Sequence, residues 1–199
     1  MNQNEDVSNT KKALQTLRSR GVFRAKDAVK LGIPRTTLAR LTEEGELNRL
    51  GRGLYIHPNS PIDDAERDFA LACARFGPRS VIGGPTALFH YGLIEQVPVQ
   101  IWLLVPTQKK TTSRQYRIIR TGLSSKVGVN DNGSYRITTV ERTIAEAFRY
   151  ASKIGLRTAV HAARKALSQG LTTEQKVFEV AKKLKIENHI LKVWEAVIA

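Results

Sequence analysis

Four side chains within one short stretch of the chain have the chemistry needed to recognise a nucleic acid. Arg35, Thr36, Thr37 and Arg40 offer guanidinium and hydroxyl groups at adjacent positions. Arginine donates paired hydrogen bonds to guanine edges or phosphates, and threonine hydroxyls bind phosphates or bases. Arg52 stands between two glycines, a spacing typical of a tight turn that exposes its central residue. We therefore predict that these residues contact DNA.

Three further basic residues of the same segment are candidates for phosphate contacts: Arg24, Lys26 and Arg49. Arg49 has a second interpretation, because Glu46 precedes it by three residues and is able to pair with it. Arg24 and Lys26 are equally consistent with simple solvation at the start of a helix.

A second basic group lies further along the chain, where no acidic residue occurs between Glu95 and Asp131. Residues 115–121 are predicted to form a strand, which places Arg117 and Arg120 on opposite faces. Such a surface fits a nucleic acid or an acidic partner protein. It is equally typical of a solvated edge strand whose charges prevent aggregation. The candidate residues of this surface are Lys109, Lys110, Arg114, Arg117 and Arg120.

The chain offers little material for catalysis or metal binding. Its single cysteine, Cys73, cannot form an internal disulfide, and its four histidines are scattered. The segment Gly83-Gly-Pro-Thr86 lacks the lysine of a phosphate-binding loop. A DNA-processing enzyme would need clustered carboxylates to hold a metal ion, and the only acidic-x-lysine triplet is Glu174-Gln-Lys176. We expect no catalytic residue, no metal and no cofactor.

The elements predicted around the first group form a winged helix-turn-helix. Asn9 or Thr10 is expected to cap the first helix, and Gly32-Ile-Pro34 separates the second from the third. Two alternating segments around Gly51-Arg-Gly53 predict a β-hairpin. In this fold the third helix enters the major groove, and the hairpin contacts the minor groove or the backbone. Winged helices also bind proteins, but here the exposed helix face is basic and hydroxyl-bearing. The predicted helices span residues 10–20, 25–31 and 35–44, and the strands 46–50 and 54–57.

The remaining residues predict a larger α+β domain, with a small sheet flanked by helices. The turn-rich segment Pro58-Asn-Ser-Pro61 marks the boundary. We therefore predict a winged helix-turn-helix DNA-binding domain over residues 1–60 and a C-terminal domain over residues 61–199. Its predicted helices span residues 62–76, 86–91, 140–151, 156–168, 173–184 and 189–198, and its strands 99–105, 115–121 and 134–138.

Composition and charge favour a folded protein with an anionic partner. Hydrophobic residues make up 41% of the 199 residues, which is enough for a core, and the formal net charge is +14. Both predicted domains carry an excess of basic residues, which favours nucleic acid as the partner. The polar start and the absence of a long apolar run predict no signal peptide and no membrane span. We expect a cytoplasmic protein that does not bind membranes.

Taken together, four segments resemble the AbiEi-type antitoxins of bacterial abortive-infection (type IV) toxin–antitoxin systems. The resemblance covers residues 10–165 and departs from the family pattern at Tyr91 and Glu146. The segments are Arg18-Ser-Arg-Gly-Val-Phe-Arg-Ala-Lys-Asp-Ala28, Gly32-Ile-Pro-Arg-Thr-Thr-Leu-Ala-Arg-Leu41 with Gly45-Glu-Leu47 and Arg52-Gly-Leu-Tyr55, Thr86-Ala-Leu-Phe-His-Tyr-Gly-Leu93, and Ile137-Thr-Thr-Val-Glu-Arg-Thr-Ile144.

This resemblance implies a winged-helix autorepressor that binds inverted repeats in double-stranded operator DNA of its own operon. It also implies that the C-terminal antitoxin domain neutralises a cognate nucleotidyltransferase toxin, without necessarily forming a stable complex with it. The alternative is a plain winged-helix transcriptional regulator whose C-terminal domain senses a ligand or dimerises.

Overall fold

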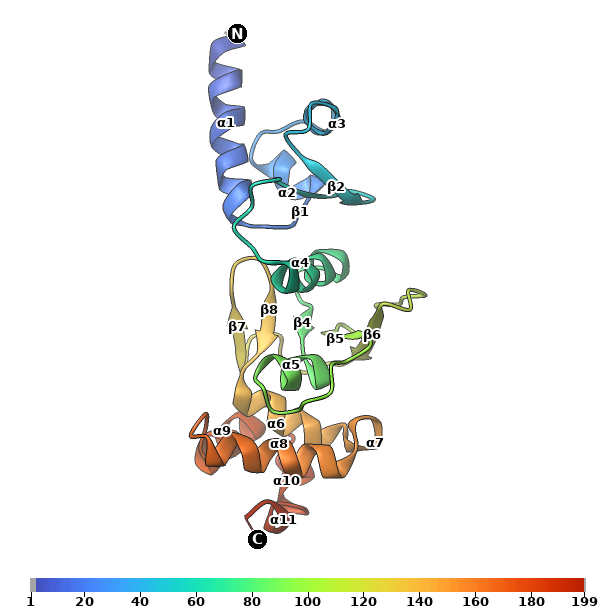
Figure 1. Cartoon of the computed structure of the whole chain (residues 1–199), viewed down its shortest axis with the longest axis vertical. Helices are drawn as coiled ribbons and strands as arrows, with labels where there is room; N and C mark the ends of the chain where they lie inside the picture. Colours follow the sequence, from blue (N-terminus) through green and yellow to red (C-terminus); the bar gives the residue numbers. More distant parts are fainter. Residues whose placement is uncertain (1–2, 199) are drawn as a thin grey trace. The chain divides into compact units, whose positions relative to one another are not determined.

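The computed structural model describes the backbone of residues 3–198 and the side chains of residues 9–198. The predicted α+β class is confirmed, because helices combine with two small sheets (Figure 1). The chain divides into two compact units. The first comprises residues 1–78 and 133–135, and the second comprises residues 79–132 and 136–199. The division into functional domains at residue 60 stays a prediction.

The first unit begins with the predicted winged helix-turn-helix. Its helices are α1 (Gln3–Ser19), α2 (Ala25–Lys30) and α3 (Arg35–Glu43), and its strands are β1 (Phe23–Arg24), β2 (Asn48–Gly51) and β3 (Leu54–Ile56). The strands form an antiparallel sheet in the order β1-β3-β2. Leu17, Ile33, Leu38 and Leu47 are fully buried among the three helices and the sheet. This core fixes α3 relative to the β2–β3 hairpin.

The first helix starts earlier than predicted, so the expected cap at Asn9 or Thr10 is wrong. Both residues lie inside α1, which already begins at Gln3. Their side chains favour helix starts because they satisfy free backbone N–H groups.

The first unit also contains α4 (Asp64–Phe76), which begins with a side-chain cap. Asp63 accepts a hydrogen bond from the backbone N–H of Glu66 at 2.7 Å. Phe69 packs edge-on against Tyr135 with the ring centroids 5.5 Å apart, and Tyr135 is buried. Cys73 is buried in α4.

The second unit contains a five-stranded sheet in the order β6-β5-β4-β8-β7. The pairs β4–β5 and β7–β8 are antiparallel, whereas β4–β8 and β5–β6 are parallel. Two of the strands, β4 and β7, were not predicted from the sequence. The strands are β4 (Val81–Ile82), β5 (Ile101–Val105), β6 (Tyr116–Arg120), β7 (Val129–Asp131) and β8 (Arg136–Thr138).

Helices supply most of the core of the second unit. Ile144 and Phe148 of α6, Ala162 of α8 and Val177 of α9 are buried together. The helix predicted over residues 189–198 is instead divided into two short helices. The chain between them places Trp194 against Phe148 and Phe178. The helices are α5 (Gly84–His90), α6 (Val140–Arg149), α7 (Ala151–Ile154), α8 (Leu156–Ser168), α9 (Glu174–Lys183), α10 (Asn188–Leu191) and α11 (Glu195–Ile198).

A buried arginine connects α6 to the loop that precedes β7. Arg142 is 1% exposed, and its Nη1 donates to the carbonyl oxygens of Ser124 and Val127, each at 2.6 Å. Its Nε donates to Oε1 of Glu146 at 2.9 Å. Gly128 passes so close that an added Cβ would lie 2.8 Å from Cβ of Arg142. The arginine therefore supplies hydrogen-bond donors to two carbonyl groups of this loop.

Candidate nucleic-acid interface

The third helix is held by two leucines, which determine its exposed side. Leu38 and Leu41 are buried, so the opposite side of α3 is directed to solvent. Pro34 precedes the helix in an extended conformation, and its ring favours the abrupt start of α3. The first turn of α3 therefore leaves backbone N–H groups free to meet an anion.

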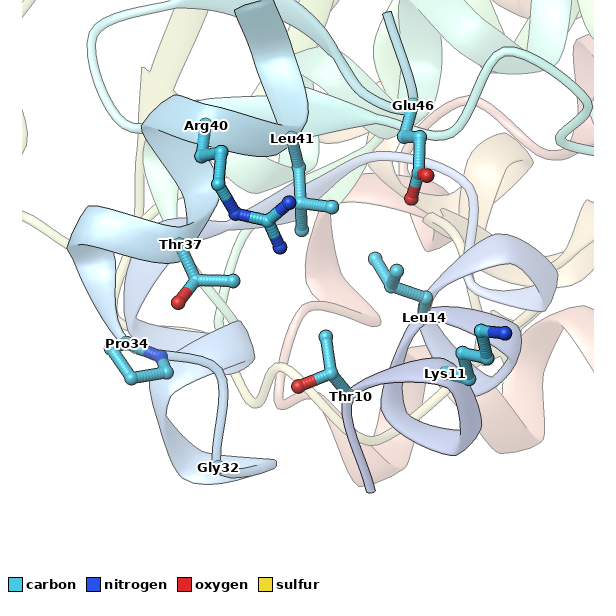
Figure 2. Close-up of a pocket in the computed structure, with 9 residues that line it drawn as sticks. All are labelled: Thr10, Lys11, Leu14, Gly32, Pro34, Thr37, Arg40, Leu41 and Glu46. Carbon is cyan, nitrogen blue, oxygen red and sulfur yellow. The ribbon is translucent and has the colours of Figure 1, made fainter. Parts of the chain in front are cut away.

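The four predicted residues of α3 do not all point the same way. Arg35 and Thr36 are exposed at the start of the helix, whereas Thr37 is half-buried. Thr37 and Arg40 border a hollow of about 410 Å³ between α3 and α1, with Thr10 and Leu14 on its other side (Figure 2). The sequence analysis placed these residues correctly on one helix. It did not show that Arg35 and Thr36 lie at the exposed start of α3 whereas Thr37 and Arg40 border the hollow.

Arg40 is engaged with an acidic residue one turn later. Its Nη1 lies 2.7 Å from Oε1 and 2.8 Å from Oε2 of Glu44. Both side chains remain accessible, since Arg40 is 59% and Glu44 44% exposed. An exposed pair of this kind contributes little to stability and exchanges readily for a competing anion. The ion pair therefore holds the guanidinium of Arg40 beside the end of α3 and leaves it exposed to solvent.

The β2–β3 hairpin forms the wing and exposes Arg52 at its tip. Gly53 adopts a positive φ of 69°, which glycine adopts without strain, and Arg52 between the two glycines is exposed. Arg49 donates from Nε to the carbonyl oxygen of Gly51 at 3.3 Å, so it contacts the hairpin turn. The pairing register shifts between Arg49 and Gly51, a bulge that bends the strand.

The side chains of Arg24 and Lys26 differ in their contacts and in their exposure to solvent. Nε of Arg24 lies 3.1 Å from Oδ2 of Asp27, and the backbone N–H of Arg24 donates to the same oxygen at 3.2 Å. Arg24 therefore has a structural role at this helix start. Lys26 is exposed. The backbone N–H of Ala25 donates to the carbonyl of Gly53 at 2.9 Å, which joins the start of α2 to the end of the wing.

Two charged residues beside α3 were missed by the sequence reasoning. Lys11 of α1 and Glu46, which follows α3, line the same hollow as Arg40 (Figure 2). Lys11 was within the predicted first helix, but helical periodicity does not reveal how two helices cross. Glu46 was considered only as a partner of Arg49.

The basic residues of the second unit gather around β6 and the loop before it. Arg117 and Arg120 are exposed on opposite faces of β6, as the alternation predicted. The guanidinium carbon of Arg117 lies 5.6 Å from the centre of the Trp102 ring, a cation–π distance. Lys110 and Arg114 of the loop are exposed, and Lys109 is half-buried. Their contact with a nucleic acid or a protein stays a prediction.

Among the residues that the structure describes, no group of three histidine, cysteine, aspartate or glutamate side chains is placed to hold a metal ion. Two carboxylates of α6 have other partners: Glu141 accepts a hydrogen bond from Thr172 at 3.0 Å, and Glu146 pairs with Arg142.

Within the described part of the chain, no helix is both long and apolar enough to cross a membrane.

Residues 12–57 match the family model described as "Transcriptional regulator, AbiEi antitoxin". The resemblance to AbiEi antitoxins predicted from the sequence is thus confirmed for the winged helix. The match supports a role as a DNA-binding antitoxin and transcriptional regulator. No curated protein gives a significant match to the chain.

Proposed function

We propose that this protein is an AbiEi-type antitoxin that represses transcription of its own toxin–antitoxin operon. In this proposal α3 enters the major groove of operator DNA, and the wing contacts the adjacent minor groove or backbone. The proposal rests on the observation that the start of α3 is exposed and basic and that the arginine at the tip of the wing is exposed as well. Both lie inside the segment that matches the family model. Action on operator DNA would place the protein in the cytoplasm.

Different residues of the first unit are suited to contact different parts of the DNA. Arg35 and Thr36 lie at the N-terminal end of α3, where residues of a recognition helix reach base edges. Arg49, Arg52 and Lys26 suit phosphate contacts, because their positions on the wing and α2 lie outside the recognition helix. Thr37 and Arg40 approach DNA from the side of the hollow. Arg24 contributes charge while its backbone N–H donates to Asp27 at the start of α2.

We further propose that residues 61–199 neutralise a cognate nucleotidyltransferase toxin and that residues 1–60 bind DNA. The system would then act in abortive infection, as a defence against phage. The proposed role of residues 61–199 rests on the resemblance to AbiEi antitoxins, which in the sequence extends to residue 165. A plain winged-helix regulator would bind DNA equally well but would not relieve the toxicity of a neighbouring gene product.

Binding to the DNA upstream of its own gene tests the repressor function. We expect the purified full chain to prefer this DNA over a scrambled duplex of equal length by at least about 10³-fold at physiological salt. Fluorescence anisotropy over a salt series measures both affinities. Equal affinity for the two duplexes, lost together as salt rises, would show that the net charge alone produces binding.

Replacement of the wing arginine separates a phosphate contact from solvation. Arg52→Ala is expected to reduce the slope of log affinity against log salt by about one unit, the effect of one released counterion. Arg157→Ala, which removes an exposed arginine of α8, is the matched control and is expected to leave the slope unchanged. A slope for Arg52→Ala equal to that of the unsubstituted chain would remove Arg52 from the interface.

A further inference from the structure

One edge of the five-stranded sheet is open at β6. This strand is the last in the order β6-β5-β4-β8-β7, and among the described residues it pairs with β5 alone. The loop of residues 106–115 that joins β5 to β6 projects beside it (Figure 1). Strand edges offer unpaired backbone groups to any extended chain that approaches them.

The hydrogen-bond register identifies which backbone groups of β6 are open. The N–H of Ile101 donates to the carbonyl of Gln115 at 3.0 Å, and the N–H of Thr121 donates to the carbonyl of Val105 at 2.9 Å. In a parallel pair, every second residue directs both of its backbone groups toward the same neighbouring strand. Arg117 and Ile119 are therefore paired with β5. Ile118 and Arg120 direct their N–H and C=O groups outward.

Two adjoining grooves follow this open edge. One has a volume of about 540 Å³ and the other about 460 Å³, and both are lined by Ile118 and Arg120 of the strand and by Thr111 and Thr112 of the loop. The remaining charged side chains that line them are all basic: Lys110 in the first groove, and Arg114, Arg117 and Lys153 in the second.

We infer that the open edge of β6 binds an extended, acidic segment of a partner protein as an added β-strand. Side chains of an added strand alternate between the two faces of the sheet. An acidic residue on one face would lie near Arg117, and one on the other face would lie near Arg120. The basic grooves thus complement acidic side chains on either face of the segment.

The backbone of β6 favours a peptide over a nucleic acid at this edge. Ile118 and Arg120 present acceptors as well as donors, and an acceptor needs a donor from its partner. Phosphate oxygens only accept hydrogen bonds, so they would leave the two carbonyl groups unsatisfied. A peptide backbone supplies N–H and C=O groups in alternation and satisfies both kinds. This inference concerns the second unit and does not depend on the proposed DNA binding.

A fluorescein-labelled peptide of eight residues that alternates glutamate and threonine tests the inference with the full chain. Anisotropy should detect its binding, and the same peptide with lysine for glutamate should not bind. Arg120→Gln removes a charge and keeps the outward N–H, whereas Arg120→Pro removes both. Proline is tolerated here because the lost N–H does not pair with β5. We expect Arg120→Pro to bind about fivefold more weakly than Arg120→Gln, the effect of one backbone hydrogen bond.

Modified peptides keep the test decisive if Arg120→Pro does not fold. N-methylation of either all threonine or all glutamate amides blocks the donors on one edge of the peptide. One of these two peptides should lose binding to the unsubstituted chain, and the other should retain it. Retention of binding by both would overturn the inference, as would failure of the unmodified peptide to bind. Equal affinities for Arg120→Pro and Arg120→Gln, with tighter binding of an eight-nucleotide oligothymidylate, would assign the edge to nucleic acid.

Discussion

Replacement of Arg142 by methionine is expected to lower the free energy of unfolding of the second unit by about 3–5 kcal/mol. Removal of one partner of a buried ion pair leaves the other charge without compensation, and losses of this size follow. Glu146 is 1% exposed, and its Oε2 has no hydrogen-bond partner among the described residues, so it depends on Arg142 for its compensation. The carbonyl groups of Ser124 and Val127 would lose their donor as well. Urea unfolding monitored by the fluorescence of buried Trp194 measures the change.

The pH dependence of the same variant identifies the cause of the loss. Burial raises the pKa of Glu146, and the guanidinium of Arg142 lowers it again only in part. The folded chain therefore binds a proton at Glu146 more readily than the unfolded chain. Stability from this group is present below the unfolded pKa and is lost as pH rises through the folded pKa. Without Arg142 the pKa rises further, so we expect Arg142→Met to lose more stability than the unsubstituted chain as the pH rises above 4.5, the ordinary pKa of a glutamate.

The double variant Arg142→Met with Glu146→Leu is the matched control. It removes the unpaired carboxylate, so it should be more stable than Arg142→Met alone, and its extra dependence on pH should disappear. A double variant as unstable as the single one would mean that the bonds to the loop, rather than the buried charge, account for the loss.

The elements that the sequence predicted are those with a strong local pattern. The third helix and the wing have leucines at helical spacing and glycines at the turn, and the structure places them within a few residues of the prediction. The strands that were missed have no such pattern. Val81–Ile82 is too short to show alternation, and Val129–Asp131 contains asparagine and aspartate, which are rare in strands. The first forms because the longer β5 pairs with it, and the second because each of its residues pairs with β8.

The candidate interface was predictable in its residue types but not in its three-dimensional grouping. The sequence indicated that Arg35, Thr36 and Arg40 are exposed, because Leu38 and Leu41 define the buried side of their helix. It did not indicate that Glu44 holds Arg40, since arginine and glutamate one turn apart often remain unpaired in solvent. The long-range contacts of Arg142 with residues 124 and 127 have no local signal at all.

Replacement of Arg40 by alanine is expected to weaken binding to operator DNA by about 1–3 kcal/mol and to reduce the preference for one base pair. The guanidinium is exposed at the edge of α3 and leaves Glu44 readily, because an exposed pair contributes less than a bidentate contact with a base. Anisotropy with operator duplexes substituted at single positions measures both the affinity and the specificity. An unchanged specificity ratio would show that Arg40 does not read a base.

Two further variants distinguish direct recognition from loss of a helix ion pair. Arg67→Ala removes an exposed arginine of α4 that lies 3.1 Å from Asp64, so it breaks a comparable pair outside the proposed interface and should leave operator binding unchanged. Glu44→Ala releases Arg40 and removes a negative charge beside α3, so we expect tighter binding to any duplex. If residues 1–60 bind DNA and residues 61–199 neutralise the toxin, as proposed, Arg40→Ala should still relieve the toxicity of the co-expressed nucleotidyltransferase. Loss of that rescue together with DNA binding would show that α3 serves both activities.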